Sequence, residues 1–433
     1  PNLQLSSPTP APAPPRLSSF TSSPWDTEPA IATERNGHTS ETIGEEIESV
    51  DVERERGFWK RLELVQVGMV PEKEGWLGPQ KYKVESDKRT GGSVTRRYSD
   101  FVWLMDCLVK RYPFRLLPPL PPKKRLPDAT FLEQRRKGLQ RFISTLVNHP
   151  VMKDDGALNV FLTEPNFEAW RKRTNVSTEE ESASKKLNPA QEMSIPADLE
   201  EKLSVLRTHL PTLLLSYQKM VALAERSLAR IQASSADSSR FALSLATLSE
   251  TIPQSCHKKN CGLCSSLASG LGAIGDSWTK VAEISEKRAM TILSGSIESL
   301  KSQRDLYVAF RDLFLRHDKL SKDAVEALRK KVETRQKKVE TLKGAQKPGW
   351  EIEVDKLIAA IDQDNATIAT LLSRRVFVRA CMWHELTVVY HSRQAAQATL
   401  GWREFGKEEL ESIEAVEGVW EGLNERLKSM PVE

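Results

Sequence analysis

The chain has 433 residues, a formal net charge of +4 and five cysteines. This length exceeds one ordinary hydrophobic core and predicts two or three domains with linkers. Three cysteines crowd between Cys256 and Cys264 instead of forming the even framework of a small secreted domain, so a reducing compartment is expected. The sequence contains no run of about 18 apolar residues and no basic-then-apolar leader, so no bilayer-spanning helix or export signal is predicted.

The positive charge is concentrated in one part of the chain. Residues 55–173 carry 24 Lys and Arg against 14 Asp and Glu, an excess of ten positive charges. Such an imbalance favours an anionic partner.

Residues 1–52 begin with a leader rich in Pro, Ser and Thr. Without apolar periodicity this leader cannot bury enough surface to offset the entropy of ordering, so it is predicted to be disordered. The chain begins at Pro1 instead of a methionine, so a trimmed chain is expected.

Residues 53–173 read as one α+β domain. The segments RLELVQVGMV, KYKVES and SVTRRYS alternate like strands, and DKRTGG supplies a turn, which together predict a three-stranded meander. DFVWLMDCLVKRY and TFLEQRRKGLQRFISTLVNHP then predict two helices. The intervening PFRLLPPLPPKKRLP must be extended, because proline cannot continue a helix and restricts the residue before it.

The remainder is predicted to be a charged linker at 174–195 and an all-α domain at 196–433. Three long helices are expected in this domain, over 197–250, 264–342 and 351–429, and the last two would each be about 120 Å long if straight.

Apolar residues in these helices follow a coiled-coil-like seam. The seam positions are Leu267, Leu271, Ile274, Trp278 and Val281, and then Ile358, Ile361, Asn365, Ile368 and Leu372, with Asn365 as the one polar interruption. Further apolar residues widen the stripe, so burial against a second protomer is favoured over a monomeric three-helix bundle. The fold class is therefore multidomain, an α+β module followed by an all-α domain.

Three segments in the α+β region carry a family resemblance. RRYSDF, then LPPLPPK from Leu117 to Lys123, then EQRRKGLQRF, in this order and spacing, resemble the phox-homology (PX) domain over about residues 55–165. The three-helix region that follows resembles a BAR domain, so the chain resembles a PX-BAR sorting nexin, specifically the fungal vacuolar-sorting nexins of the Mvp type. Each segment alone has a simpler reading, such as a solvated strand edge or a proline-rich partner ligand.

The resemblance implies a site for phosphatidylinositol 3-phosphate. Arg97 would bind the 3-phosphate with its planar guanidinium group, and Tyr98 would lie under the inositol ring. Lys123 would approach the 1-phosphate, and Arg135 would bind the hydroxyls at positions 4 and 5, leaving little room for phosphates there. Arg96 is expected to face the other way, because neighbouring side chains on a strand alternate.

Other residues are predicted to touch membrane directly. Leu120, Lys124, Arg125 and Leu126 could meet the bilayer beside the pocket, although such leucines are as often core residues. A basic helical tail leads to the turn at 342–350, which would be the tip of a BAR-type arm. Its lysines are Lys330, Lys331, Lys337, Lys338, Lys343 and Lys347. The alternative reading makes them a solvated helix face paired with Glu333 and Glu340.

No metal or other cofactor is expected. The metal-ligating residue types gather only at Cys256, His257, Cys261 and Cys264, where two ligands are adjacent and no second Cys-x2-Cys pair follows. A loop of reduced or partly oxidised thiols is the simpler interpretation.

No catalytic motif is present in the sequence, so the chain is not expected to be an enzyme. The sequence instead favours a peripheral protein on the cytosolic face of endosomal membranes, which would bind phosphatidylinositol 3-phosphate and sense or form curved membrane as a BAR homodimer or higher homo-oligomer. Its role would be the sorting, recycling and vacuolar transport of transmembrane cargo. The alternative is a phosphoinositide-recruited protein scaffold that does not deform membrane. Nucleic acid is not an expected partner, because acidic residues interleave along all three helices.

Overall fold

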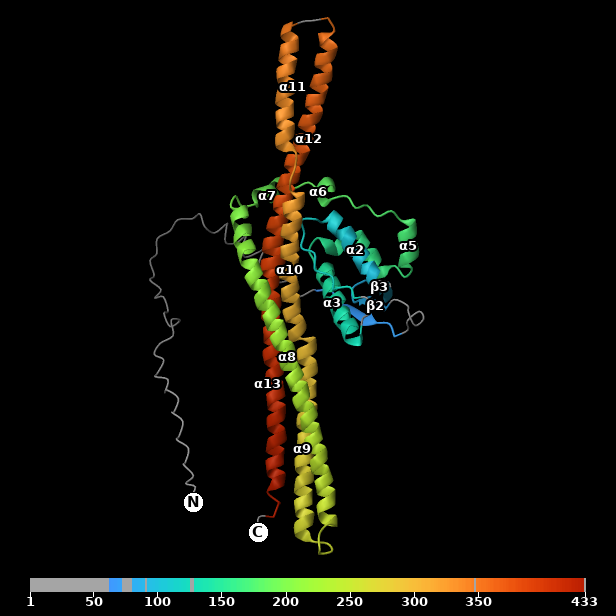
Figure 1. Ribbon diagram of the computed structural model, residues 1–433, viewed down its shortest axis with the longest axis vertical. Coiled ribbons are helices and arrows are strands. Elements are labelled where there is room, and N and C mark those ends of the chain that lie inside the picture. The colour runs from blue at the N-terminus through green and yellow to red at the C-terminus, as the bar shows by residue number, and fades with distance from the viewer. Residues whose placement is uncertain (1–61, 72–79, 90–91, 125–127, 346–347, 432–433) are drawn as a thin grey trace, which may run out of the picture. The chain divides into compact units, whose positions relative to one another are not determined.

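The structure is a computed structural model that describes residues 62–71, 80–89, 92–124, 128–345 and 348–431 (Figure 1). The predicted leader, residues 1–52, lies outside the described residues.

An antiparallel sheet opens the described chain, in the order β1 (Val65–Met69), β2 (Lys81–Ser86) and β3 (Val94–Arg97). Val67 pairs with Val84, which in turn pairs with Val94, and all three side chains are buried. Alternate residues face the core because successive side chains on a strand point to opposite sides. The predicted three-stranded meander is confirmed.

Helices cover the buried face of this sheet. Phe101 is fully buried and makes edge-to-face contacts with Tyr82, Phe142 and Phe161, at centroid distances of 6.3, 6.4 and 5.0 Å. The helices are α2 (Tyr98–Arg111), α3 (Ala129–Val147), a 3-10 turn (Met152–Asp154), α4 (Gly156–Thr163) and α5 (Phe167–Arg173). The proline segment between α2 and α3 begins with a turn at 113–115 and forms neither helix nor strand over 116–124, which agrees with the prediction that proline excludes a helix there; residues 125–127 lie outside the described residues.

The segment predicted to be a linker contains two short helices, α6 (Glu181–Ser184) and α7 (Pro189–Met193). Glu181 is buried against Arg115, and Glu180 pairs with Arg374 of the following domain at 2.8 Å. The segment therefore packs against both neighbouring domains through specific charged contacts.

The all-α domain begins with the longest helix and continues with shorter ones. Its elements are α8 (Leu199–Gln254), α9 (Gly262–Ser294), α10 (Ser296–Leu320), α11 (Val325–Ala345), α12 (Trp350–His384), a π-helix (Glu385–Ser392) and α13 (Arg393–Leu427). The long all-helical domain is confirmed, but the prediction of one unbroken helix over 264–342 is wrong.

Two breaks divide that predicted helix. Gly295 leaves helical geometry with φ −95° and ψ −86°, while its N–H still bonds to Thr291. The second break follows Leu320, where the Asp323 carboxylate accepts from the Val325 N–H at the start of α11. An acidic side chain that binds the first free N–H groups favours a new helix start over continuation of the old one.

Helices α8 and α9 pack closely through small residues. Ser235 donates to the carbonyl of Ala282 at 2.9 Å, and a Cβ on Gly275 would lie 3.3 Å from the carbonyl oxygen of Ala242. The predicted seam residues of α9 lie beside this contact and stay partly exposed, Leu267 with 37 % of its surface. In this part of α9 the innermost face is therefore formed by small residues, and the larger seam side chains are only partly buried.

The hairpin of α11 and α12 has a heptad core. Val325, Val332 and Val339 recur every seven residues and pack against Val354, Ile361 and Ile368, which have the same spacing. Asn365, which was placed on the predicted seam, is exposed, and its neighbour Asp364 is buried and pairs with Arg335. The predicted interruption near 342–350 corresponds to the interval between the end of α11 at Ala345 and the start of α12 at Trp350, of which residues 346 and 347 lie outside the described residues.

Candidate functional site

The predicted pocket lies where β3 runs into α2. Arg97 ends the strand, and its backbone N–H donates to the Asp100 carboxylate at 2.8 Å, which starts the helix. The Arg97 side chain is 38 % exposed, and its Nη1 atom lies 3.9 Å from the exposed Glu168 carboxylate of α5. An exposed pair at this distance contributes little, so a phosphate could displace Glu168.

Arg96 faces the opposite side, as the strand alternation predicted. Its guanidinium is fully buried and donates to the carbonyls of Phe161 and Glu164 at 2.8 and 2.6 Å. Burial lowers the pKa of Arg96 to about 10. Arg96 therefore satisfies the last carbonyl groups of α4, and only Arg97 of the arginine pair faces outward.

Tyr98 and Arg135 form the inner part of the site. The Tyr98 hydroxyl donates to the Pro121 carbonyl at 2.5 Å. The Arg135 guanidinium lies 4.8 Å from the Tyr98 ring centroid and 4.7 Å from that of Phe131. Burial raises the pKa of Tyr98, with the Arg135 charge acting in the opposite direction. The three elements that carry these residues thus converge on one site.

Arg135 is buried but not saturated with hydrogen bonds. It is only 7 % exposed, and among the described residues its Nε and Nη2 atoms have no hydrogen-bond partner. A buried donor without a partner costs about 1–3 kcal/mol, so native proteins rarely leave one unless a ligand or water completes it. Ring hydroxyls of a bound inositol are suitable acceptors.

A cavity of about 460 Å³ adjoins this guanidinium. Its walls include Pro121, Phe131 and Arg135, and also Val221 of α8 and Lys301 of α10. Gly138 allows the proline segment to approach α3, because a Cβ there would lie 2.9 Å from the Pro121 Cβ.

Sequence reasoning missed Phe131, Gly138 and Glu168 as parts of the site, although the glycine in EQRRKGLQ was a usable signal.

The basic segment after the prolines is only partly described. Lys123 is exposed, and Lys124 pairs with Asp128 at 3.8 Å and lies 5.3 Å from the Phe131 ring centroid. Leu120 is partly buried against the core of the α+β domain, which agrees with the alternative reading of it as a core residue. Arg125 and Leu126 lie outside the described residues.

The lysines of the arm that the structure describes are exposed, but several have acidic neighbours. Lys337 pairs with Glu333 at 2.8 Å in the same helix, as the alternative reading expected, and Lys338 pairs with Glu353 across the hairpin at 2.8 Å. Lys331 reaches Asp364 at 4.0 Å. Lys330 and Lys343 are exposed on α11, and Lys347 lies outside the described residues.

The cysteines of the α8–α9 loop come together. The thiols of Cys256, Cys261 and Cys264 lie within 4.8 Å of one another, whereas His257 is exposed and not part of this group. The Cys264 backbone N–H, and then the Cys264 and Cys256 side chains, lower the pKa of Cys261 to about 7.

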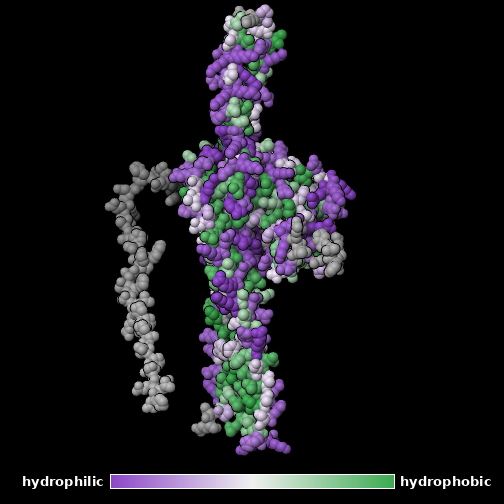
Figure 2. All heavy atoms as spheres, in the orientation of Figure 1, coloured by the Kyte–Doolittle hydropathy of each residue, from purple (hydrophilic) through white to green (hydrophobic). Residues whose placement is uncertain are grey.

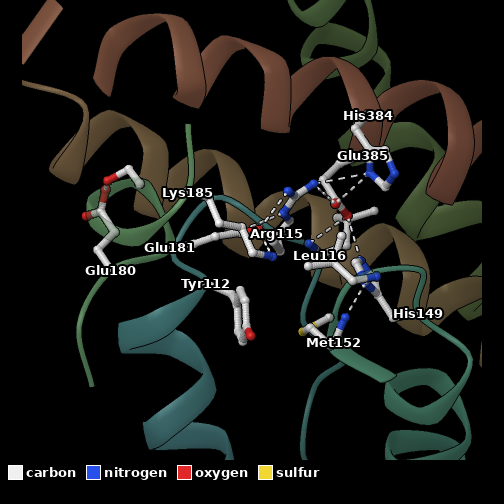
Figure 3. A network of polar contacts seen from close by, with 12 residues as sticks. Tyr112, Arg115, Leu116, His149, Met152, Glu180, Glu181, Lys185, His384 and Glu385 are labelled. Carbon is white, nitrogen blue, oxygen red and sulfur yellow. Dashed lines mark hydrogen bonds and ion pairs between the residues drawn. The ribbon is translucent and has the colours of Figure 1, made fainter. Parts of the chain in front are cut away.

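A buried polar network that the sequence did not reveal joins the α+β domain, the linker and the helices (Figure 3). Arg115 donates to Glu181 at 3.0 Å and to Glu385 at 3.1 Å, and the Leu116 N–H donates to Glu385 at 3.0 Å. His149 Nδ1 accepts from the backbone N–H groups of Val151 and Met152, so the proton resides on Nε2, which lies 3.1 Å from Glu385.

The protonation states within this network are set by burial and by neighbouring charges. Burial raises the pKa of Glu385, but His149, His384 and Arg115 outweigh it and hold this pKa well below its usual range. Burial lowers the pKa of His149, and Glu385 only partly opposes it. The network therefore contains a neutral histidine and an ionised carboxylate.

Comparison with known proteins agrees with this architecture. Residues 85–165 match the PX domain family, and residues 175–433 match the sorting nexin 8/Mvp1 BAR domain family. A PX domain followed by a BAR domain defines the PX-BAR sorting nexins, a class of non-enzymatic membrane-trafficking adaptors. Within that class the chain belongs to the sorting nexin 8/Mvp1 family, since the BAR domain model of that family matches more than half of its length.

The relatives are fungal. The chain is 53 % identical over 390 residues to sorting nexin MVP1 of Cryptococcus neoformans, covering 87 % of this chain and 63 % of that protein. It is 35 % identical over 384 residues to sorting nexin mvp1 of Neurospora crassa, covering 86 % of this chain and 48 % of that protein. The chain thus spans about half to two thirds of the length of these relatives.

Among solved structures, the chain resembles one titled as the cryo-EM structure of the SNX-BAR Mvp1 tetramer. The TM-score is 0.68 at 26 % identity, over 83 % of this chain and 99 % of that one.

Across the described ranges, no helix combines the length and apolar character needed to cross a membrane.

Proposed function

We propose that the chain binds phosphatidylinositol 3-phosphate at the site formed by Arg97, Tyr98, Lys123 and Arg135, on the cytosolic face of endosomal membranes. The observation that carries this proposal is the buried Arg135 guanidinium, which lies against Tyr98 with two donors available for ring hydroxyls. Arg97 directly precedes Tyr98 in the chain and is partly exposed, and charge-assisted contacts to a phosphate can be bidentate.

We further propose that the helical domain brings two or more copies together and that the assembly senses or forms curved membrane for the sorting of transmembrane cargo. Exposed apolar residues on three of its helices support an interface, and Figure 2 shows apolar surface gathered where these helices run together. They include Leu243 and Leu248 of α8, Leu263 and Met290 of α9, and Leu410, Ile413 and Trp420 of α13. The related Mvp1 structure is titled a tetramer, which supports self-association.

Liposome flotation tests the pocket. Arg97→Ala should abolish selective binding to vesicles containing phosphatidylinositol 3-phosphate, because a charge-assisted contact contributes about 1.5–3 kcal/mol, or roughly tenfold to a hundredfold in affinity. Lys110→Ala is a matched control, since it removes an exposed positive charge about 18 Å along α2 from Tyr98.

Selective binding retained by Arg97→Ala would refute the pocket assignment.

Electron microscopy of the same vesicles separates the curvature hypothesis from the protein-scaffold hypothesis. Tubules formed by the unmodified chain favour a curvature role, and vesicles that bind the chain but stay round favour the protein scaffold.

A further inference from the structure

The loop between α8 and α9 carries three thiols in a Cys-x4-Cys-x2-Cys spacing. Cys256 follows the end of α8 at Gln254, Cys261 is the N-cap residue of α9, and Cys264 lies in the first turn of that helix. All five cysteines of the chain are free thiols, but Cys107 and Cys381 are buried elsewhere, whereas these three are partly exposed.

Local backbone geometry brings the three thiols together. Asn260 adopts a left-handed conformation with φ 53°, which reverses the chain directly before Cys261. Side chains three positions apart on a helix lie on the same face, so Cys261 and Cys264 are neighbours at the start of α9. Ser249 donates to the Ala268 carbonyl at 2.7 Å, which holds the two helices together below the loop.

The separation of the thiols is close to what a metal ion requires. Their sulfur atoms lie within 4.8 Å of one another. A tetrahedral zinc ion with Zn–S bonds of about 2.3 Å has sulfur atoms about 3.8 Å apart, so each pair needs to approach by at most about 1 Å. A surface loop can make this adjustment by rotating side chains.

We propose that Cys256, Cys261 and Cys264 together bind one Zn²⁺ ion or a similar soft divalent cation, with a solvent molecule in the fourth position. Binding converts three thiols to thiolates and releases their protons to solvent, so no oxidant or reductant is needed. Lys258 and Lys259 in the same loop favour the negative charge of such a cluster. The ion would link the end of α8 to the start of α9.

Cobalt substitution tests the proposal on the full reduced chain. One equivalent of Co²⁺ should produce sulfur-to-cobalt charge-transfer absorption and the visible bands of a tetrahedral site, and one equivalent of Zn²⁺ should remove both. Replacing all three cysteines by serine should abolish these bands, while circular dichroism stays unchanged. Cys107→Ala, which removes a thiol outside the cluster, should retain them.

Two results would overturn the inference. One is the absence of charge-transfer absorption in the fully reduced chain, and the other is unchanged absorption in the triple serine variant. The test is independent of the lipid pocket, because binding to phosphatidylinositol 3-phosphate vesicles is measured separately on the same preparations.

Discussion

Glu385 is the acceptor on which the buried network between the domains depends. Its carboxylate is fully buried, with Arg115 and His384 near one oxygen and Leu116 and His149 near the other. Glu385→Gln keeps the shape but replaces one oxygen by an amide NH₂, which donates instead of accepting. In either orientation the amide therefore faces donor groups that have lost their acceptor.

The cost follows from this count. A buried donor that loses its acceptor costs about 1–3 kcal/mol, and more if it is charged. If the amide NH₂ faces the Leu116 N–H and His149, these two donors lose their acceptor. If it faces Arg115, this buried cation loses one of its two carboxylate partners. We expect a loss of about 3 kcal/mol, which is roughly a hundredfold in a local opening equilibrium.

Hydrogen exchange measures this opening at named positions. The amide of Leu116 should exchange about a hundredfold faster in Glu385→Gln, and amides of the α6 segment should follow, because Glu181 shares Arg115 with Glu385. Glu414→Gln, an exposed glutamate on α13, is the matched control and should leave exchange unchanged. Equal exchange of Leu116 in both variants would show that the network does not hold the domains together.

Three further changes test other parts of the molecule. Trp278→Asp should lower the mass of the assembly measured by light scattering, because Trp278 packs edge-to-face on Phe241 and Trp420 within the exposed apolar surface. An unchanged mass would place the interface elsewhere. Reversing Lys330 and Lys343 to glutamate should weaken binding to phosphatidylserine vesicles by about 1 kcal/mol per residue, yet spare phosphatidylinositol 3-phosphate recognition; equal binding would mean that the arm does not touch lipid. Burial lowers the pKa of His149 in the folded state, so the free energy of unfolding should fall as pH drops below about 6.5, by at most about 1.4 kcal/mol per pH unit. A melting temperature that stays constant from pH 7.5 to 5.5 would contradict this.

Local patterns in the sequence were enough to predict the three strands of the α+β domain and its helices α2 and α3. Alternation in KYKVES and SVTRRYS marked strands with one buried face, and the same alternation separated the roles of Arg96 and Arg97. The helical domain was predictable for the same reason, since apolar spacing is a property of neighbouring residues. Even so, the break at Gly295 was missed, because a glycine inside a helical pattern can equally well continue the helix.

Contacts between distant segments were decided by the tertiary structure. Arg115 and Glu385 are 270 residues apart, and nothing in the local sequence around either one indicates its partner. The contact of Arg135 with Tyr98 likewise requires α3 to pack beside the start of α2, which family resemblance implied but spacing alone did not. The three thiols converge because Asn260 turns the chain between two closely packed helices. Secondary structure follows from periodicity along the chain, whereas a buried charge or a cluster of ligands is stabilised only when folding brings its partners together and excludes water from them.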